Sequence, residues 1–320
     1  MYNRRKFLKE SGALALSGFM LPGISRAFMN TKVFNAKTLG IQLYSVNKFL
    51  DDDPKGLFKK IADIGFKEVE TAFSQKGYYY GMTPKELSGV FKDLGLKWIS
   101  HHVMGASFKP RPQPSNATQE KQGQNQASQS GGKGGPGNFP KFVTLSDGYQ
   151  QLVDEAGEAG LEYLVCASTP IGTLDEIKSS IEVFNKTGEA CKKAGIQFAY
   201  HNHVNEFDEV EGKRPYDLIL SQTDENMVKM ELDLAWATKA SQDPLELFKG
   251  HPGRFPLWHV KDYDLKNNKI TEIGNGSVDF KRIFTGKDTA DMKHFFYEQD
   301  GAPTLDSVSL SFKNLSDILS

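Results

Sequence analysis

The sequence predicts an α/β protein folded as a (β/α)8 TIM barrel, and two observations carry this prediction. Short apolar segments rich in β-forming residues recur about 30 residues apart, with one larger interval. Between them, stretches such as 57–64 and 181–191 carry apolar residues three and four positions apart, which predicts amphipathic helices. A doubly wound sheet is the alternative. The sequence lacks a glycine-rich turn after the first strand and a P-loop, so nucleotide binding has no support.

Eight segments are expected to form the barrel strands, because each is short, apolar and rich in β-branched or aromatic residues. They are 39–46, 66–72, 97–103, 163–168, 197–203, 228–234, 256–262 and 294–300. Several helical stretches end in a glycine that leads into the next strand, the expected place of a helix C-cap. These glycines are Gly65, Gly95, Gly160 and Gly195.

The barrel is expected to occupy residues 38–320 as a single domain with an insertion at about 107–140. Within the insertion, residues 109–138 lack Val, Ile, Leu, Met, Phe, Trp and Tyr. Such a segment cannot bury a core, so we expect it to be disordered. It follows the third strand on the face that carries the active site of a barrel, so it is either a neutral surface insertion or a lid.

The first 27 residues resemble a twin-arginine export signal. Arg4 and Arg5 precede a short apolar segment, 12–22, and a small residue at Ala27. This order predicts a signal peptide over 1–27, use of the Tat export machinery and an exported, periplasmic protein. An N-terminal amphipathic helix with two chance arginines is the alternative. The sequence has no cysteine near the cleavage site and no later run of 18 apolar residues, so we expect no membrane anchor.

The composition excludes two classes of protein. Lys and Arg number 39 against 40 Asp and Glu, so no basic surface for nucleic acid is expected. The two cysteines, Cys166 and Cys191, cannot make a disulfide framework or a cysteine-rich zinc site, although one bridge is open to an exported protein.

Polar side chains gather at the predicted carboxyl ends of the strands, which face the active site in a barrel. Five of the seven histidines lie there. The polar set comprises Gln42, Tyr44, Glu70, His101, His102, His201, Asn202, His203, Glu206, Asp233, Trp236, His259, Lys261, Asp262, Glu298 and Asp300.

Four members of this set, on four consecutive strands, form a candidate site for one divalent metal ion: His201, Asp233, His259 and Glu298. Imidazole and carboxylate ligands together suit Mn, Co, Zn or Fe better than Ca. Singly, each residue also has a structural explanation, since an Asp after a strand often caps the next helix. Together they favour a metal site, and we expect one divalent ion, with Mn, Co, Zn and Mg as the ions to test.

Six segments resemble the xylose-isomerase-like TIM-barrel superfamily, above all its sugar phosphate isomerase/epimerase branch, over about residues 38–320. The segments are 40–44, 64–70, 200–203, 231–236, 258–262 and 272–276. The superfamily contains sugar isomerases, ketose 3-epimerases, inosose dehydratases and AP endonucleases. The nuclease branch needs more metal ligands and a cationic surface, which this sequence lacks.

The resemblance also implies a ligand set. Ketose 3-epimerases of this superfamily hold one metal through Glu, Asp, His and Glu on successive strands. Asp233, His259 and Glu298 match the last three ligands, and His201 stands where the first Glu is typical. Both glutamates of those enzymes also move protons, so only Glu298 keeps that dual role here. The candidates for the missing acid or base are Glu206, Glu70, His102 and Lys261.

The function that the resemblance implies is a metal-dependent sugar isomerase or epimerase acting through an enediolate. Gln42, Tyr44, His203 and Trp236 are the candidate substrate-binding residues. Without a phosphate cradle, and with an export signal, an unphosphorylated keto-sugar or glycoside is the expected substrate. Two alternatives remain: a lyase or hydratase on keto-glycosides, favoured by the imidazole at position 201, and an exported sugar-binding protein without catalysis. The tyrosines at 78–80 either line the sugar site or pack within a loop.

Overall fold

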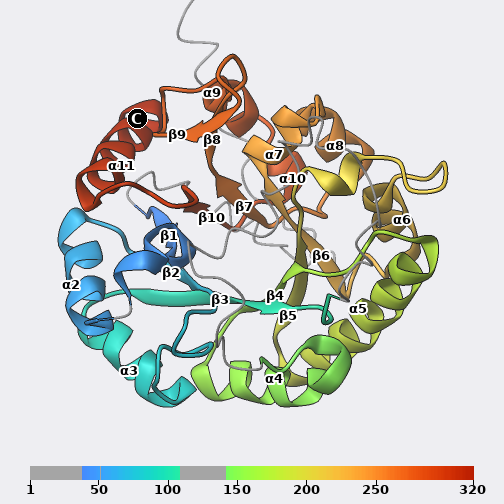
Figure 1. Ribbon diagram of the computed structural model, residues 1–320, viewed down its shortest axis with the longest axis horizontal. Helices are drawn as coiled ribbons and strands as arrows, with labels where there is room; N and C mark the ends of the chain where they lie inside the picture. Colours follow the sequence, from blue (N-terminus) through green and yellow to red (C-terminus); the bar gives the residue numbers. More distant parts are fainter. Residues whose placement is uncertain (1–37, 51, 109–141) are drawn as a thin grey trace, which may run out of the picture. The chain divides into compact units, whose positions relative to one another are not determined.

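The computed structural model describes residues 38–50, 52–108 and 142–320, which form a closed barrel of parallel strands. The strand order around the barrel is β1-β10-β7-β6-β5-β4-β3-β2 (Figure 1). The predicted (β/α)8 barrel is therefore confirmed. The signal predicted over 1–27 and the insertion from residue 109 onward lie outside the described residues. The barrel strands are β1 Gly40–Gln42, β2 Glu68–Thr71, β3 Lys97–Met104, β4 Tyr163–Ser168, β5 Gln197–His201, β6 Val228–Asp233, β7 Leu257–Val260 and β10 His294–Tyr297.

Helices form a ring outside the barrel (Figure 1). Phe312 of the last helix packs edge-on against Phe66, just before β2, with ring centroids 4.9 Å apart, so this helix closes the ring beside the first strands. The helices are α2 Pro54–Ile64, α3 Pro84–Asp93, α4 Leu145–Ala159, α5 Leu174–Ala194, α6 Pro215–Gln222, α7 Leu234–Lys239, α8 Pro244–Gly250, α9 Phe280–Phe284, α10 Lys287–Ala290 and α11 Leu305–Leu319, with the 3-10 helices η1 Leu43–Phe49 and η3 Asn205–Phe207.

Local sequence signals set the helix ends. At the start of α3, the Thr83 hydroxyl accepts a hydrogen bond from the Glu86 N–H (3.2 Å), and the Glu86 carboxylate accepts one from the Thr83 N–H (2.8 Å). At the far ends of α4 and α5, Gly160 and Gly195 adopt φ of +76°, a conformation that glycine reaches without steric cost. The predicted C-caps at these two glycines are confirmed.

An apolar layer fills part of the barrel interior and places the polar residues next to it. Its members are Ile99, Tyr163, Val165, Ala199, Leu257 and Phe296. His201, His259 and Glu298 each follow a member of this layer by two residues along the chain. Because side chains of a strand alternate between its two faces, these three side chains point into the barrel on the carboxyl side of the apolar layer.

A register shift between β2 and β3 also shapes the interior. Val69 pairs with Trp98 and Glu70 with Ser100, so Ile99 is the extra residue of a bulge. A bulge redirects the side chains around it. Here the Ser100 hydroxyl reaches the Glu70 carboxylate and donates a hydrogen bond of 2.6 Å.

The strand predicted over 39–46 is wrong beyond Gln42. The side-chain oxygen of Gln42 accepts a hydrogen bond from the Tyr44 N–H (2.9 Å), which caps η1 and turns the chain out of the barrel wall. Tyr44 therefore lies on a short helix. The strands predicted over 197–203, 256–262 and 294–300 also end early, so Lys261 and Glu298 lie just past strand ends.

A hairpin that the sequence did not predict follows β7. Its strands, β8 Asp262–Asp264 and β9 Lys269–Thr271, pair antiparallel. The Asp262 carboxylate accepts hydrogen bonds from the backbone N–H groups of Gly274 (2.8 Å), Gly276 (2.9 Å) and Val278 (3.2 Å). One carboxylate thus fixes the chain that returns from the hairpin.

At the amino end of the barrel, His294 joins two glutamates in what we call the amino-end cluster: Glu68, Glu162 and His294. His294 Nδ1 lies 2.8 Å from Glu68 Oε2, and its Nε2 lies 3.3 Å from Glu162 Oε2. Burial opposes the charge, but the two glutamates raise the pKa of His294. The hydrogen bond with His294 in turn lowers the pKa of Glu162 to about 2.

Two further predictions can be compared with the structure. Cys166 and Cys191 are both free and buried. In the described part of the chain, no helix combines the length and the apolar character that crossing a bilayer requires.

Candidate metal centre and acid–base site

Four predicted metal ligands lie together at the carboxyl side of the apolar layer. His201 ends β5, Asp233 ends β6, His259 lies on β7, and Glu298 follows β10. The ligand atoms that these residues offer lie within 4.8 Å of one another, and all four side chains are buried. We call this set the outer cluster.

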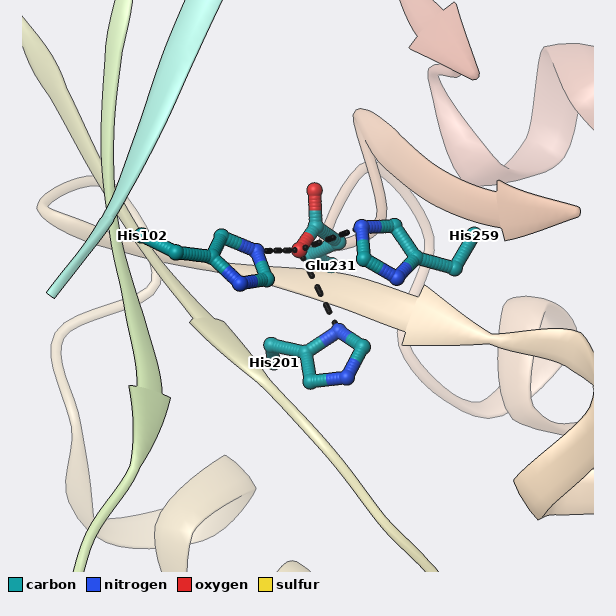
Figure 2. A group of neighbouring side chains, drawn as sticks. All are labelled: His102, His201, Glu231 and His259. Atoms are coloured by element: carbon teal, nitrogen blue, oxygen red, sulfur yellow. Dashed lines mark hydrogen bonds and ion pairs between the residues drawn. The ribbon is translucent and has the colours of Figure 1, made fainter. Parts of the chain in front are cut away.

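A second group of side chains shares two histidines with the outer cluster. Glu231 Oε2 lies 2.7 Å from His102 Nε2, 3.2 Å from His201 Nδ1 and 3.2 Å from His259 Nε2 (Figure 2). We call His102, His201, Glu231 and His259 the inner cluster. Glu231 precedes Asp233 by two residues on the same strand, so both carboxylates face the barrel interior in successive layers.

Glu70 lies beside the inner cluster and is fully hydrogen-bonded. Gln42 donates to its Oε1 (2.8 Å) and Ser100 to its Oε2 (2.6 Å). The same Oε1 lies 2.6 Å from His259 Nε2 and 3.1 Å from His102 Nε2. Glu70 and Gln42, predicted as catalytic and substrate-binding residues, therefore contact each other and the histidines of the inner cluster.

The two buried glutamates of this region differ in charge preference. Burial opposes ionisation of Glu70, but His102 and His259 outweigh it and hold the pKa of Glu70 well below its usual value. Burial and the neighbouring Glu70 carboxylate raise the pKa of Glu231. Because two carboxylates compete for the same positive partners, Glu231 binds a proton more readily than Glu70 does.

The three imidazoles of the inner cluster also differ in the direction of their pKa shifts. Burial and the neighbouring His259 push the pKa of His201 well below its usual value, which keeps this ring neutral. Burial opposes the charge on His259 and His102, but Glu231 and Glu298 raise the pKa of His259, and Glu70 and Glu231 raise the pKa of His102 to about 9.

Lys261 is a buried cation among three carboxylates. Its Nζ lies 2.6 Å from Glu298 Oε2, 3.0 Å from Asp233 Oδ2 and 3.1 Å from Asp300 Oδ2. Burial opposes its charge, but these carboxylates raise the pKa of Lys261 well above its usual value. Burial likewise opposes ionisation of Glu298, yet Lys261 and His259 lower the pKa of Glu298. Glu298 is therefore an ionised carboxylate held by two positive neighbours.

Asp233 fills both roles that the sequence suggests for it, as a cap of the next helix and as a candidate metal ligand. Its Oδ1 accepts a hydrogen bond from the Trp236 N–H (2.8 Å) and caps α7. Its Oδ2 faces the outer cluster and lies at ion-pair distance from Lys261 but makes no hydrogen bond. One oxygen thus fixes the carboxylate, and the other is left for the site.

An aromatic side chain stands beside the outer cluster. The Lys261 ammonium lies 5.0 Å from the Trp236 ring centroid, and the Lys239 ammonium lies 5.1 Å from it. Tyr263 packs against the same ring, with centroids 5.8 Å apart. His203 lies 4.9 Å from the His201 ring. The predicted binding residues Trp236 and His203 therefore border the outer cluster.

Two predicted site residues, Glu206 and Tyr44, make contacts away from both clusters. Glu206 accepts hydrogen bonds from the Tyr200 hydroxyl (2.8 Å) and the His203 N–H (2.9 Å), so both oxygens hold the loop after β5. Tyr44 packs against Phe73, with ring centroids 5.6 Å apart. Within the tyrosines at 78–80, Tyr78 and Tyr80 are buried, which agrees with loop packing.

Sequence reasoning missed Glu231. The signal was present, because Glu231 precedes Asp233 by two residues and a strand returns to the same face with that period. Most residues predicted for the site end a strand or lie just past one, whereas Glu231 lies two residues before the end of β6.

The outer cluster fits a divalent metal ion on its own chemistry. Two imidazoles and two carboxylates suit Zn, Mn or Co. Asp233 Oδ2 is buried 3.0 Å from Lys261 Nζ and has no hydrogen-bond partner among the described residues. Buried polar atoms are seldom left in this state, because each costs the free energy of its lost hydration. A bound ion would satisfy Asp233 Oδ2.

Sequence comparison assigns the chain to a family. The family model described as "Xylose isomerase-like TIM barrel" matches residues 58–291. The chain belongs to this family, which confirms the resemblance inferred from its strand-end motifs.

Individual relatives add detail. A sugar phosphate isomerase/epimerase from Parabacteroides distasonis is 27% identical, with a TM-score of 0.68, and the match covers 88% of this chain and 97% of that one. The IolI protein with a bound zinc atom is 14% identical, with a TM-score of 0.62 and coverage of 88% and 98%, so it shows the fold alone. An inosose dehydratase from Clostridium perfringens is 28% identical over 127 residues, 34% of this chain and 42% of the relative. The match thus spans less than half of that curated relative.

Proposed function

We propose that this protein is a metal-dependent enzyme of the sugar isomerase/epimerase type, acting through an enediolate on an unphosphorylated keto-sugar or glycoside. The observation that carries the proposal is the outer cluster, where Glu298 lies between Lys261 (2.6 Å) and His259 (2.8 Å) beside further metal-ligand groups. Family membership and the likeness to the Parabacteroides sugar phosphate isomerase/epimerase support it.

The residues that would hold the ion are His201, Asp233, His259 and Glu298. With a divalent ion bound, these residues would supply Lewis-acid chemistry, which polarises a carbonyl and makes the neighbouring C–H bond more acidic. The ring of His201 stays neutral and offers a lone pair to the ion, whereas His259, whose pKa the neighbouring carboxylates raise, would release a proton on binding it.

Glu298 is the group that we assign to remove this proton. It is buried and ionised, and a carboxylate shielded from water is an effective acceptor when its pKa approaches that of its task. Lys261 holds that pKa down in the free protein. A substrate oxygen that shares the ammonium with Glu298 would therefore raise the proton affinity of Glu298 as the reaction needs it.

Lys261 is the group that we assign to stabilise the enediolate. When Glu298 takes the proton, negative charge leaves the carboxylate and develops on a substrate oxygen nearby. A preorganised ammonium in a site without water stabilises that charge strongly, since no solvent needs to reorganise. Asp233 and Asp300, each within 3.1 Å of Lys261 Nζ, keep the ammonium in place.

A lyase or hydratase acting on keto-glycosides is the second candidate, and the imidazole at position 201 favours it. Epimerisation needs proton-carrying groups on both faces of the reacting carbon, whereas elimination needs one base and an acid for the leaving group. The outer cluster offers one glutamate. The inosose dehydratases among the relatives also support a dehydrating reaction.

Trp236 is the aromatic surface that we assign to the sugar ring, with His203, Gln42 and Tyr44 as further binding residues. The basic and apolar segments over 1–27 support export through the Tat machinery to the periplasm. Replacing Arg4 and Arg5 by lysine should retain the precursor in the cytoplasm. Unchanged export of that double variant would contradict the signal assignment.

Incubation with unphosphorylated keto-sugars in heavy water tests the proposal. Deuterium at the carbon next to the carbonyl, in a product isomeric with the substrate, is the result expected of an isomerase or epimerase. A product that has lost a group establishes the lyase instead. Sugar binding without deuterium uptake, in protein loaded with Mn, Co, Zn or Mg, would leave the non-catalytic binding protein as the function.

A further inference from the structure

The inner cluster presents a second set of metal-ligand atoms, one layer deeper than the outer cluster. Three imidazole nitrogens surround a single carboxylate oxygen: Glu231 Oε2 lies 2.7 Å from His102 Nε2 and 3.2 Å from both His201 Nδ1 and His259 Nε2 (Figure 2). The ligand atoms that the four side chains offer lie within 4.8 Å of one another.

We propose that the inner cluster binds a second transition-metal ion, of the zinc or cobalt class, through His102, His201, Glu231 and His259. Three imidazoles and one carboxylate form a tetrahedral set of the kind that Zn favours. This ion is distinct from the one assigned to the outer cluster.

The hydrogen bonding of the inner cluster is incomplete, which is the first reason for the proposal. Glu231 Oε1 is buried and has no hydrogen-bond partner among the described residues, and His201 Nδ1 lies 3.2 Å from Glu231 Oε2 without the geometry of a hydrogen bond. The His201 side chain is 3% exposed and that of Glu231 is 0% exposed, so bulk solvent does not reach these atoms. A network built only to stabilise the fold would be saturated, because each unpaired buried group weakens it.

The charge of the surroundings is the second reason. Glu70 lies against the inner cluster, with its Oε1 2.6 Å from His259 Nε2 and 3.1 Å from His102 Nε2. Two carboxylates therefore balance the two positive charges of one divalent ion. Gln42 and Ser100 hydrogen-bond to Glu70, and this outer support fixes a carboxylate that in turn orients the histidine ligands.

The two clusters can be occupied together if His201 and His259, which both clusters share, bind as bridging imidazolates that release their N–H protons to solvent. His259 Nδ1 lies 2.8 Å from Glu298 in the outer cluster, while its Nε2 lies 3.2 Å from Glu231 in the inner cluster. The ring thus presents one nitrogen to each cluster. An ion in the inner cluster would fix the orientation of the ring that serves the outer one.

Ion counting on isosteric variants tests this proposal without any substrate. Protein stripped with a chelator is reloaded with Co²⁺ or Zn²⁺ and analysed by elemental mass spectrometry and by the Co²⁺ absorption bands. We expect about two ions per chain in the unaltered protein and about one in Glu231→Gln, His102→Gln and Asp233→Asn. The Co²⁺ bands that Glu231→Gln loses should be those that Asp233→Asn keeps.

Glu68→Gln is the matched control, since Glu68 is also a buried glutamate bonded to a buried histidine, 2.8 Å away in the amino-end cluster. It should keep both ions. Thermal unfolding of each ion-free variant identifies any that fail to fold, and His102→Gln and Glu231→Gln then serve as substitutes for each other.

The outcomes separate this proposal from the proposed function. One ion per chain that Glu231→Gln and His102→Gln keep and Asp233→Asn loses would overturn the inner site and leave the proposed function intact. One ion that Glu231→Gln loses and Asp233→Asn keeps supports the inner site and removes the metal from the proposed mechanism. Protein that binds no ion overturns both.

Discussion

The two ends of the barrel use the same residue types for different purposes. At the amino end, both nitrogens of His294 meet a glutamate, Glu68 on one side and Glu162 on the other. At the carboxyl end, His201 Nδ1, Glu231 Oε1 and Asp233 Oδ2 are buried without a hydrogen-bond partner among the described residues. Each unpaired buried group costs free energy, and the three gathered at the carboxyl end belong to groups that could bind an ion from outside.

The largest difference between the two ends should appear in catalysis. Glu298→Gln keeps the shape of the side chain but removes the proton acceptor, so turnover should fall roughly 1,000-fold while sugar binding remains. Glu68→Gln makes the same change at the amino end and should leave turnover unaltered. Steady-state kinetics with the substrate that the heavy-water experiment identifies would measure both effects. Normal turnover of Glu298→Gln would remove Glu298 from the mechanism.

The next largest effect concerns the balance of charge around Lys261. Lys261→Met leaves Glu298, Asp233 and Asp300 without their shared cation, so the ion-free protein should lose about 3–5 kcal/mol of unfolding free energy. Added Zn²⁺ or Mn²⁺ should restore much of this loss by supplying positive charge to the outer cluster. Denaturant unfolding with and without the ion measures both values, and a variant as stable as the parent would show that the three carboxylates do not depend on this cation.

Removal of metal should affect the carboxyl end alone. An ion present at about 100 times its dissociation constant stabilises the folded chain by about 2.7 kcal/mol, so chelation should lower Tm by roughly 5–10 °C. His294→Gln should show the same chelator-induced shift, because its ring lies outside both metal-ligand groups. Equal Tm with and without chelator would contradict metal binding.

The smallest effect is a pH dependence at the amino end. Because the pKa of His294 is raised in the folded state, its ion pairs stabilise the fold fully at pH values below about 6.5, the usual pKa of histidine. This stabilisation is lost as the pH rises through the pKa of the folded state. The pKa of Glu162, lowered to about 2, contributes stability above about 4.5, lost as pH falls. His294→Gln should therefore cost about 1–2 kcal/mol near pH 5.5 and less near pH 8.5. A cost independent of pH would refute the ionised pair.

Much of the fold follows from the sequence because the barrel repeats one local pattern. Strand and helix signals alternate at regular spacing, and caps such as Gly160 and Gly195 act within a few residues. The end of β1 and the β8–β9 hairpin were missed because single side chains decide them. Gln42 turns the chain by capping η1, and Asp262 gathers N–H groups from as far as Val278. Neither the Gln42 cap nor the Asp262 hydrogen bonds produce a periodic pattern in the sequence.

The site divides in the same way. The residues of the outer cluster can be predicted because each lies at, one residue before or just past the end of a strand, and the closed barrel brings strand ends together. The contact partners of each side chain cannot be predicted from the sequence, because the register of the strands and the β-bulges determine them. The bulge at Ile99 brings Ser100 to Glu70, and the layer that holds Glu231 faces His102 across the barrel. Glu206 lies in the loop after β5, but both of its carboxylate oxygens accept hydrogen bonds from nearby residues, Tyr200 and His203.

The most direct test of a metal-dependent carboxyl end is the metal content of His259→Gln. His259 belongs to both clusters, so the parent protein purified without chelator should carry at least about one transition-metal ion per chain and the variant close to none. His294→Gln, the same substitution at the amino end, should keep the parent's content. A His259→Gln protein that folds and retains the full metal content would contradict the central claim.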